Sequence, residues 1–174
     1  MALLKKRAGK KEVNLEEMVK SGDQATAYEA LQLYRSRSNR AKQKGEIDNA
    51  IRIVVAGTKC LLSNGYDSAG GELTALFMDM VEEHKRDADS DVRSMIIEID
   101  DCFQPNSPAR LTYLKSCLKW TTVVGTRRLG DTMVNTRLAL SMWASGQQRL
   151  GVYHFTAGED PETLVDKVKL PYTI

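Results

Sequence analysis

Two histidines and three cysteines are the residues of this chain that could supply a catalytic base, a nucleophile or metal ligands. His84 lies in a run of charged residues at 82–86, which is typical of an exposed helix end, whereas His154 lies between two aromatic residues, which favours helix packing. The cysteines include no short-spaced pair and are expected at reduced core positions; they are Cys60, Cys102 and Cys117. The sequence leaves open a catalytic cysteine–histidine pair whose two residues are far apart along the chain and meet only in the folded structure.

Sequence motifs of known enzymes and of membrane segments are absent. There is no glycine-rich phosphate loop, nucleophile elbow or zinc-protease motif, so we predict that the chain is not an enzyme and binds no cofactor. No apolar run approaches the ~18 residues that span a bilayer. Residues 1–11 carry five basic residues without the apolar core of a secretory signal. We therefore expect a cytoplasmic protein that is not inserted into a membrane.

The charges nearly cancel over the whole chain but are sorted along it. Lys and Arg number 25 and Asp and Glu 23, yet residues 35–44 contain five basic residues and no acid, while residues 72–101 contain ten acids and three basic residues. Opposite charges on different helices favour a docking surface that steers a protein partner, although two solvated faces are the plainer alternative. No aromatic residue interrupts the basic run for base stacking, so we predict no nucleic-acid binding.

Apolar residues recur at helical spacing between glycines, and no stretch alternates as a strand does. Residues 1–13 are expected to form a basic flexible tail, 14–170 a helical-repeat domain and 171–174 a C-terminal tail. The pattern predicts an all-α fold, an α-solenoid of antiparallel helical hairpins in a tetratricopeptide-like right-handed array, with a globular bundle as the alternative. After a short helix near residue 15, the helices are predicted at 25–44, 47–63, 72–85, 92–99, 107–120, 133–144, 149–157 and 160–169.

An ordered set of short segments resembles the Golgi-to-ER traffic protein four family. The segment at 103–110, which reads FQPNSPAR, and the LKW at 118–120 resemble its NSPER…LKW element. Further matches follow the family's order at Gly22-Asp23, 28–30, Ala56-Gly57, 138–143 and 153–155. The resemblance covers roughly residues 15–168 and implies a helical scaffold without catalytic activity. In that family the scaffold docks on the ATPase that targets tail-anchored membrane proteins to the ER and promotes client transfer.

The resemblance also implies which residues bind the ATPase. The family's regulatory acidic pair falls on Glu72 and Asp79, and its basic anchor falls near Arg40, Lys42 and Lys44. The family's anchoring tyrosine aligns one residue before Tyr28, which we expect to take its place. A ubiquitin-like adaptor binds the family's second helical half, and these residues stop about where that half begins, so adaptor binding is not assumed. The alternative function is a generic helical-repeat adaptor that binds a peptide or a helical protein along its concave face.

Overall fold

The computed structural model describes residues 14–168, and all regular secondary structure in that range is helical. The predicted tails at 1–13 and 171–174 lie outside the described residues. The helices are α1 Leu15–Ser21, α2 Gln24–Gln43, α3 Ile47–Ser63, α4 Asp67–Glu83, α5 Ser90–Asp100, α6 Pro108–Val124, α7 Thr132–Ala144, α8 Gln148–Ala157 and α9 Pro161–Val168.

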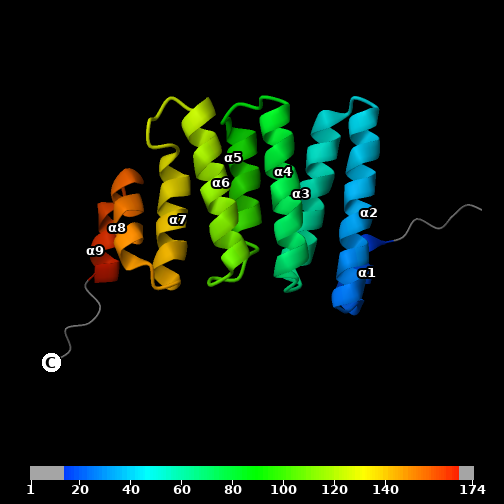
Figure 1. The fold of residues 1–174 in the computed structure, drawn as a ribbon, viewed down its shortest axis with the longest axis horizontal. Coiled ribbons are helices and arrows are strands. Elements are labelled where there is room, and N and C mark those ends of the chain that lie inside the picture. Colours follow the sequence, from blue (N-terminus) through cyan, green and yellow to red (C-terminus); the bar gives the residue numbers. More distant parts are fainter. Residues whose placement is uncertain (1–13, 169–174) are drawn as a thin grey trace, which may run out of the picture.

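The helices stand side by side in one row, with α1 and α2 at one end and α8 and α9 at the other (Figure 1). Helix α4 packs on both α2 and α6, and α3 packs on both α1 and α5, so even- and odd-numbered helices form two layers over this part of the chain. Every pair of helices that packs extensively in the described range is at most two positions apart along the chain. Such near-neighbour packing distinguishes a solenoid from a closed bundle. The predicted all-α solenoid is confirmed; its right-handed sense stays a prediction.

The helices end and begin at the glycines and capping residues that the sequence contains. Gly45, Gly65 and Gly146 each have a φ near +80° just after a helix, a conformation that only glycine adopts without steric cost. Ser107 caps α6, accepting the backbone N–H of Arg110 at 3.4 Å, and Pro108 occupies the first helical position. The predicted start of that helix is therefore confirmed.

Helix α4 begins five residues earlier than the predicted residue 72. Its first turns contain Gly70 and Gly71, which disfavour a helix when propensity is considered alone. In the structure Gly70 lies so close to the Leu62 side chain that a Cβ would approach it to 2.4 Å, and a Cβ on Gly71 would meet that of Ala109 at 3.1 Å. These glycines let α3 and α6 approach α4, so tertiary packing extends the helix through them.

A buried carboxylate joins three consecutive helices. Asp100, at the end of α5, has a side chain that is 0% exposed. It accepts hydrogen bonds from Arg110 Nε at 2.7 Å and Nη2 at 2.9 Å, and from Arg137 Nη1 of α7 at 2.6 Å. Arg137 Nη1 also lies 2.6 Å from the exposed Asp101. The two-point contact from Arg110 fixes geometry as well as charge, because the planar guanidinium matches a carboxylate.

Asp100→Asn is expected to lower the free energy of unfolding by about 3 kcal/mol, because it leaves two guanidinium groups facing a neutral buried side chain. The measurement is urea denaturation followed by circular dichroism. Asp48→Asn is the matched control, since it removes the same charge from the exposed Asp48–Arg86 pair and should change stability by no more than about 1 kcal/mol. Equal losses in the two variants would show that the buried network is not important for stability.

Candidate protein-binding face

One face of α2 carries residues spaced by seven. Tyr28, Arg35 and Lys42 are two helical turns apart in succession, so their side chains follow one line along the helix. Tyr28 is 53% exposed, which is high for a large aromatic residue. Arg35 and Lys42 are partly exposed and lie toward α4, because each forms an ion pair with that helix. The face therefore begins with an exposed ring and continues as a basic line beside α4.

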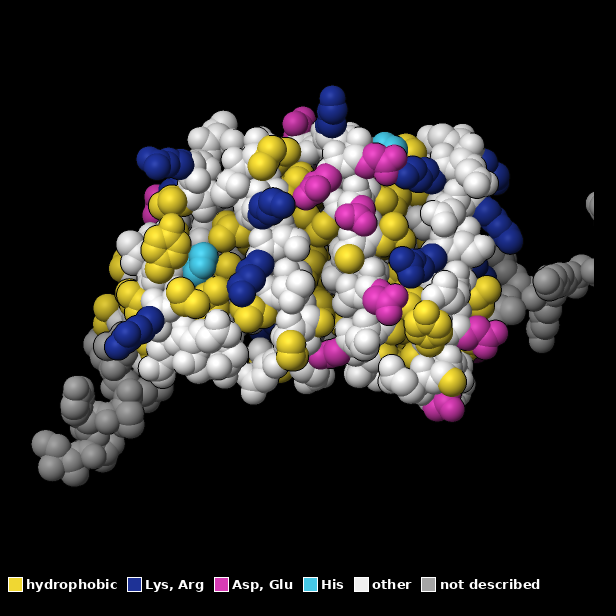
Figure 2. All heavy atoms as spheres, viewed as in Figure 1, with side chains coloured by type: hydrophobic (Ala, Val, Ile, Leu, Met, Phe, Trp, Pro, Cys, Tyr) yellow, Lys and Arg dark blue, Asp and Glu magenta, His cyan; other side chains and the backbone are white. Residues whose placement is uncertain are grey.

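The neighbouring line on α4 is acidic. Glu72 lies 3.4 Å from Arg35, and Glu83 lies 2.5 Å from Lys42, so two ion pairs bridge α2 and α4. The hydrogen bond from Lys42 lowers the pKa of Glu83. Asp79 lies between these acids along α4, is exposed, and forms no ion pair within the described part of the chain. Figure 2 shows acidic side chains gathered over α4 with basic ones beside them over α2.

These ion pairs contribute little to stability, since all four side chains are about a third or more exposed to solvent. A partner that brought its own charges could therefore exchange them at small cost. The Asp79 carboxylate has no ion pair within the described residues that must break before it binds a partner. The α2/α4 face, which we define as Tyr28, Arg35, Lys42, Glu72, Asp79 and Glu83, thus has the chemistry of a charged, reversible contact.

The structure separates the predicted basic residues. Lys42 lies on the α2/α4 face, but Arg40 precedes it by two residues and Lys44 follows it by two, which places both about 200° away around the helix. Arg40 and Lys44 are exposed and share a side of the α2 terminus with one another. Of the predicted site residues, Tyr28, Lys42, Glu72 and Asp79 come together, whereas Arg40 and Lys44 point elsewhere. The assignment of all six as partner contacts stays a prediction.

Two residues of this face were not predicted. The sequence places Arg35 in the basic run at 35–44 and Glu83 in the acidic run at 72–101, without marking either as a contact. The seven-residue spacing from Tyr28 through Arg35 to Lys42 is visible in the sequence and could have singled out Arg35. No sequence signal pairs Lys42 with Glu83, because the two are 41 residues apart and meet only when α4 packs on α2.

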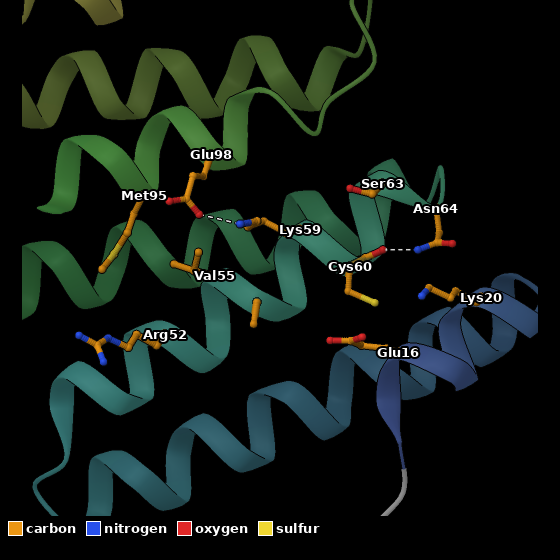
Figure 3. A pocket seen from close by; sticks show the side chains of 11 residues that line it. Glu16, Lys20, Arg52, Val55, Lys59, Cys60, Ser63, Asn64, Met95 and Glu98 are labelled. Atoms are coloured by element: carbon orange, nitrogen blue, oxygen red, sulfur yellow. Dashed lines mark hydrogen bonds and ion pairs between the residues drawn. The ribbon is translucent and has the colours of Figure 1, made fainter.

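A hollow of about 560 Å³ lies on the other layer, along α3 between α1 and α5 (Figure 3). Its floor includes Val55 and Ala56, and charges of both signs surround it. Lys59 and Glu98 pair across one side at 2.6 Å, so part of that charge is already neutralised. The mixture gives no clear preference for an acidic or a basic ligand.

Two of the three cysteine thiols lie where burial raises their pKa. Burial raises the pKa of Cys60, which lines the α3 hollow, and that of Cys117 in the core, so both are protonated at neutral pH and poor nucleophiles. No hydrogen bond joins a cysteine to a histidine among residues 14–168. In the same range no three His, Cys, Asp or Glu side chains are grouped to hold a metal ion, and no helix is both long and apolar enough to cross a bilayer.

His154 joins α8 to α7 through Asn135. The Asn135 amide nitrogen donates to the carbonyls of Leu129 at 2.8 Å and Asp131 at 3.0 Å, so its oxygen must accept from His154 Nδ1, 2.9 Å away. The neutral imidazole therefore carries its proton on Nδ1. Burial, and secondarily the charge of Lys115, lowers the pKa of His154. The residue is a packing and hydrogen-bonding element, in agreement with the interpretation from sequence.

Residues 44–170 match the family model for Golgi to ER traffic protein 4. The chain belongs to this family. Its similarity to the Golgi to ER traffic protein 4 homolog of Homo sapiens is 26% identity over 151 residues, covering 87% of this chain and 45% of that protein. Homolog B of Xenopus laevis gives the same identity and coverage, and the Gallus gallus homolog is 26% identical over 136 residues, covering 78% and 42%. The family resemblance noted in the sequence is thus confirmed.

The fold agrees with a solved structure of the Golgi to ER traffic protein 4 family. The crystal structure of Get4 from C. therm. superposes with a TM-score of 0.81 at 24% identity, covering 88% of this chain and 49% of that one. This likeness supports the α-solenoid. The chain spans about half the length of the curated relatives that it matches, 45% for the human homolog.

The segment that resembles the family's NSPER element has a structural role here. Ser107 caps α6, Pro108 begins it, and Arg110 holds the buried Asp100. Gly57, in another matched segment, lies so close to the Tyr34 ring that a Cβ would approach it to 2.5 Å. The residues that carry the family resemblance therefore include several that fix helix packing, which is a different property from partner contact.

The α7–α8 contact is expected to weaken in mild acid. The unfolded chain binds a proton at His154 near pH 6.5, whereas the folded pKa is lower, so the unfolded state binds more protons and stability falls as pH drops below about 6.5. Urea midpoints measured from pH 7.5 to 5.5 should decline less steeply for His154→Gln than for the unaltered chain. Parallel declines would contradict this role of His154.

Proposed function

We propose that this chain is a cytosolic, non-enzymatic scaffold that docks on the targeting ATPase of the tail-anchored protein pathway and thereby promotes client transfer to the ER. Membership of the Golgi to ER traffic protein 4 family is the observation that carries the proposal. The α2/α4 face is the proposed contact. It combines an exposed aromatic ring with acids that are held by weak ion pairs or by none.

Asp79 is central to the proposed contact. Arg35 and Lys42 hold Glu72 and Glu83 on either side of it, about two turns and one turn away along α4, and leave its own carboxylate without a cation in the described chain. A basic group on the ATPase would meet this carboxylate first. Glu72 becomes available when Arg35 turns to an acid on the partner, an exchange between solvated groups that costs little. The face is suited to fast and reversible docking.

The double variant Glu72→Lys and Asp79→Lys is expected to slow association with the ATPase about tenfold, because exposed interface charges act mainly on the encounter rate. The measurement is surface-based kinetics at two ionic strengths, with nucleotide-loaded and nucleotide-free ATPase. The unaltered chain should capture the nucleotide-loaded form preferentially. Higher salt should reduce the difference between the variant and the unaltered chain.

The matched control is Asp91→Lys with Glu98→Lys on α5. These acids are also seven residues apart and exposed, and Glu98 is in an ion pair just as Glu72 is. The control makes the same change of net charge on the opposite layer, so it separates a local contact from a general field effect. Binding that is insensitive to the α4 reversal but lost in the control would move the ATPase contact to the α3 hollow and refute the α2/α4 face as the site. No capture of the ATPase by the unaltered chain would refute the proposal.

A further inference from the structure

The seam between α4 and α6 is a second feature of the face drawn in Figure 2, on the side of α4 away from α2. Two hollows lie along it. One, of about 380 Å³, is walled by Ala75 and Met78 of α4 and by Ala109 and Tyr113 of α6. The other, of about 470 Å³, lies near the ends of both helices. Apolar side chains fill the floor of the seam between the two helices (Figure 2).

Small residues line this seam on both helices. Gly71 and Ala109 allow α4 and α6 to approach closely at one end, where a Cβ on Gly71 would meet that of Ala109 at 3.1 Å. Farther along, Ala75 and Ser116 line the wall without reaching across it. The seam therefore runs from the level of Ala109 to that of Val124, which is about 22 Å at the rise of an α-helix.

The far hollow combines apolar surface with an unpaired donor. Val123 is 76% exposed and, with Val124, forms an apolar wall. Trp120 also lines the hollow and is 2% exposed, and its indole N–H has no hydrogen-bond partner among the described residues. A buried indole N–H usually finds an acceptor. The Trp120 indole nitrogen is itself closed to solvent, so it reports on the hollow and is not an exposed donor.

The two helices that border the seam carry opposite charge. Helix α4 contains five acidic residues and no basic one. Helix α6 contains three basic residues and no acidic one, and one of the three, Arg110, is paired with the buried Asp100. In the described range no ion pair joins α4 to α6, although two join α4 to α2. Glu72 and Glu82 line the seam from α4, and Lys119 lines it from α6. Lys85 and Asp87, in the turn after α4, also line the far hollow. The seam thus has acids along α4, one lining cation on α6 at Lys119, and an apolar floor between them.

We propose that the α4/α6 seam binds an amphipathic α-helix of a partner protein, with a basic edge along α4, an acidic edge along α6 and an apolar stripe on the floor. A helix about 15 residues long matches the seam. Its apolar residues at positions i, i+3, i+4 and i+7 meet the small-residue wall, as in other complexes in which a helix lies in a groove. The complementary charges select the partner and keep it in register. The proposal does not depend on docking of the ATPase.

Designed helical peptides of 18 residues test the charge pattern. All carry the same leucine stripe; one has lysines along one edge and glutamates along the other, a second has lysines on both edges, and a third has glutamates on both. A fourth has the composition of the first in scrambled order. Fluorescence anisotropy of labelled peptides with the full chain should give a Kd at least tenfold lower for the mixed-edge peptide than for the other three. Equal or undetectable binding of all four would overturn the proposal.

The location is tested in the variant Trp143→Phe, which leaves Trp120 as the only tryptophan. The indole N–H resonance of Trp120 should shift when the mixed-edge peptide binds, and an unshifted resonance at saturation would place the peptide elsewhere. Ala75→Phe fills the seam from an exposed position and should raise the Kd at least tenfold. Ala25→Phe, at an exposed alanine on α2, is the matched control and should leave the Kd unchanged.

Lys119→Glu tests the border without filling the seam. It makes the α6 border acidic at an exposed position, so the preference should change from the mixed-edge peptide to the peptide with lysines on both edges. An unchanged preference would contradict the assigned edges. Light scattering of the unaltered chain checks for occupation of the seam by a second copy. A dimer that Ala75→Phe dissociates would replace the partner helix with self-association and overturn the proposal.

Discussion

The contact of Asp100 with Arg110 and Arg137 is the constraint on which the middle of the molecule depends. Each helix of a solenoid packs only on near neighbours, so the position of one helix is passed to the next through local contacts. A carboxylate without solvent exposure must keep its cations, because a buried charge without a partner is strongly unfavourable. Asp100 meets this need with one arginine from α6 and one from α7, and so sets how α5, α6 and α7 meet.

The exposed charges act differently from this buried network. Pairs such as Arg35–Glu72 and Lys42–Glu83 are solvated and replaceable, and their value is in steering and specificity. Helix α4 lies between the α2/α4 face and the α4/α6 seam, and its acids form ion pairs on the first side only. Toward α2, Glu72 and Glu83 form ion pairs with basic side chains, whereas no ion pair joins α4 to α6 in the described range. One helix therefore contributes to an internally paired face and to a seam, and Glu72 belongs to both.

Local patterns were sufficient to predict most helices. Glycines at 45, 65 and 146 and the cap at Ser107 act through their own backbone geometry, so their effect can be read without knowing the fold. The start of α4 could not be read in this way, because Gly70 and Gly71 are helical only where Leu62 and Ala109 pack against them. The site was predicted in part for the same reason. The acids on α4 share a face through their spacing, but that Lys42 joins them while Arg40 does not follows from the direction in which α2 faces α4.

The helical class, the turns and the family can all be predicted from the amino-acid sequence, because they depend on residue type, on short spacing and on the order of matched segments. Which charges meet depends instead on how the helices pack. Lys42 and Glu83 are 41 residues apart, and Arg137 and Asp100 are 37 apart. Pairing over such distances requires two helices to pack in one register, and that register is set by the summed shape of the small and large side chains between them, which no single segment contains.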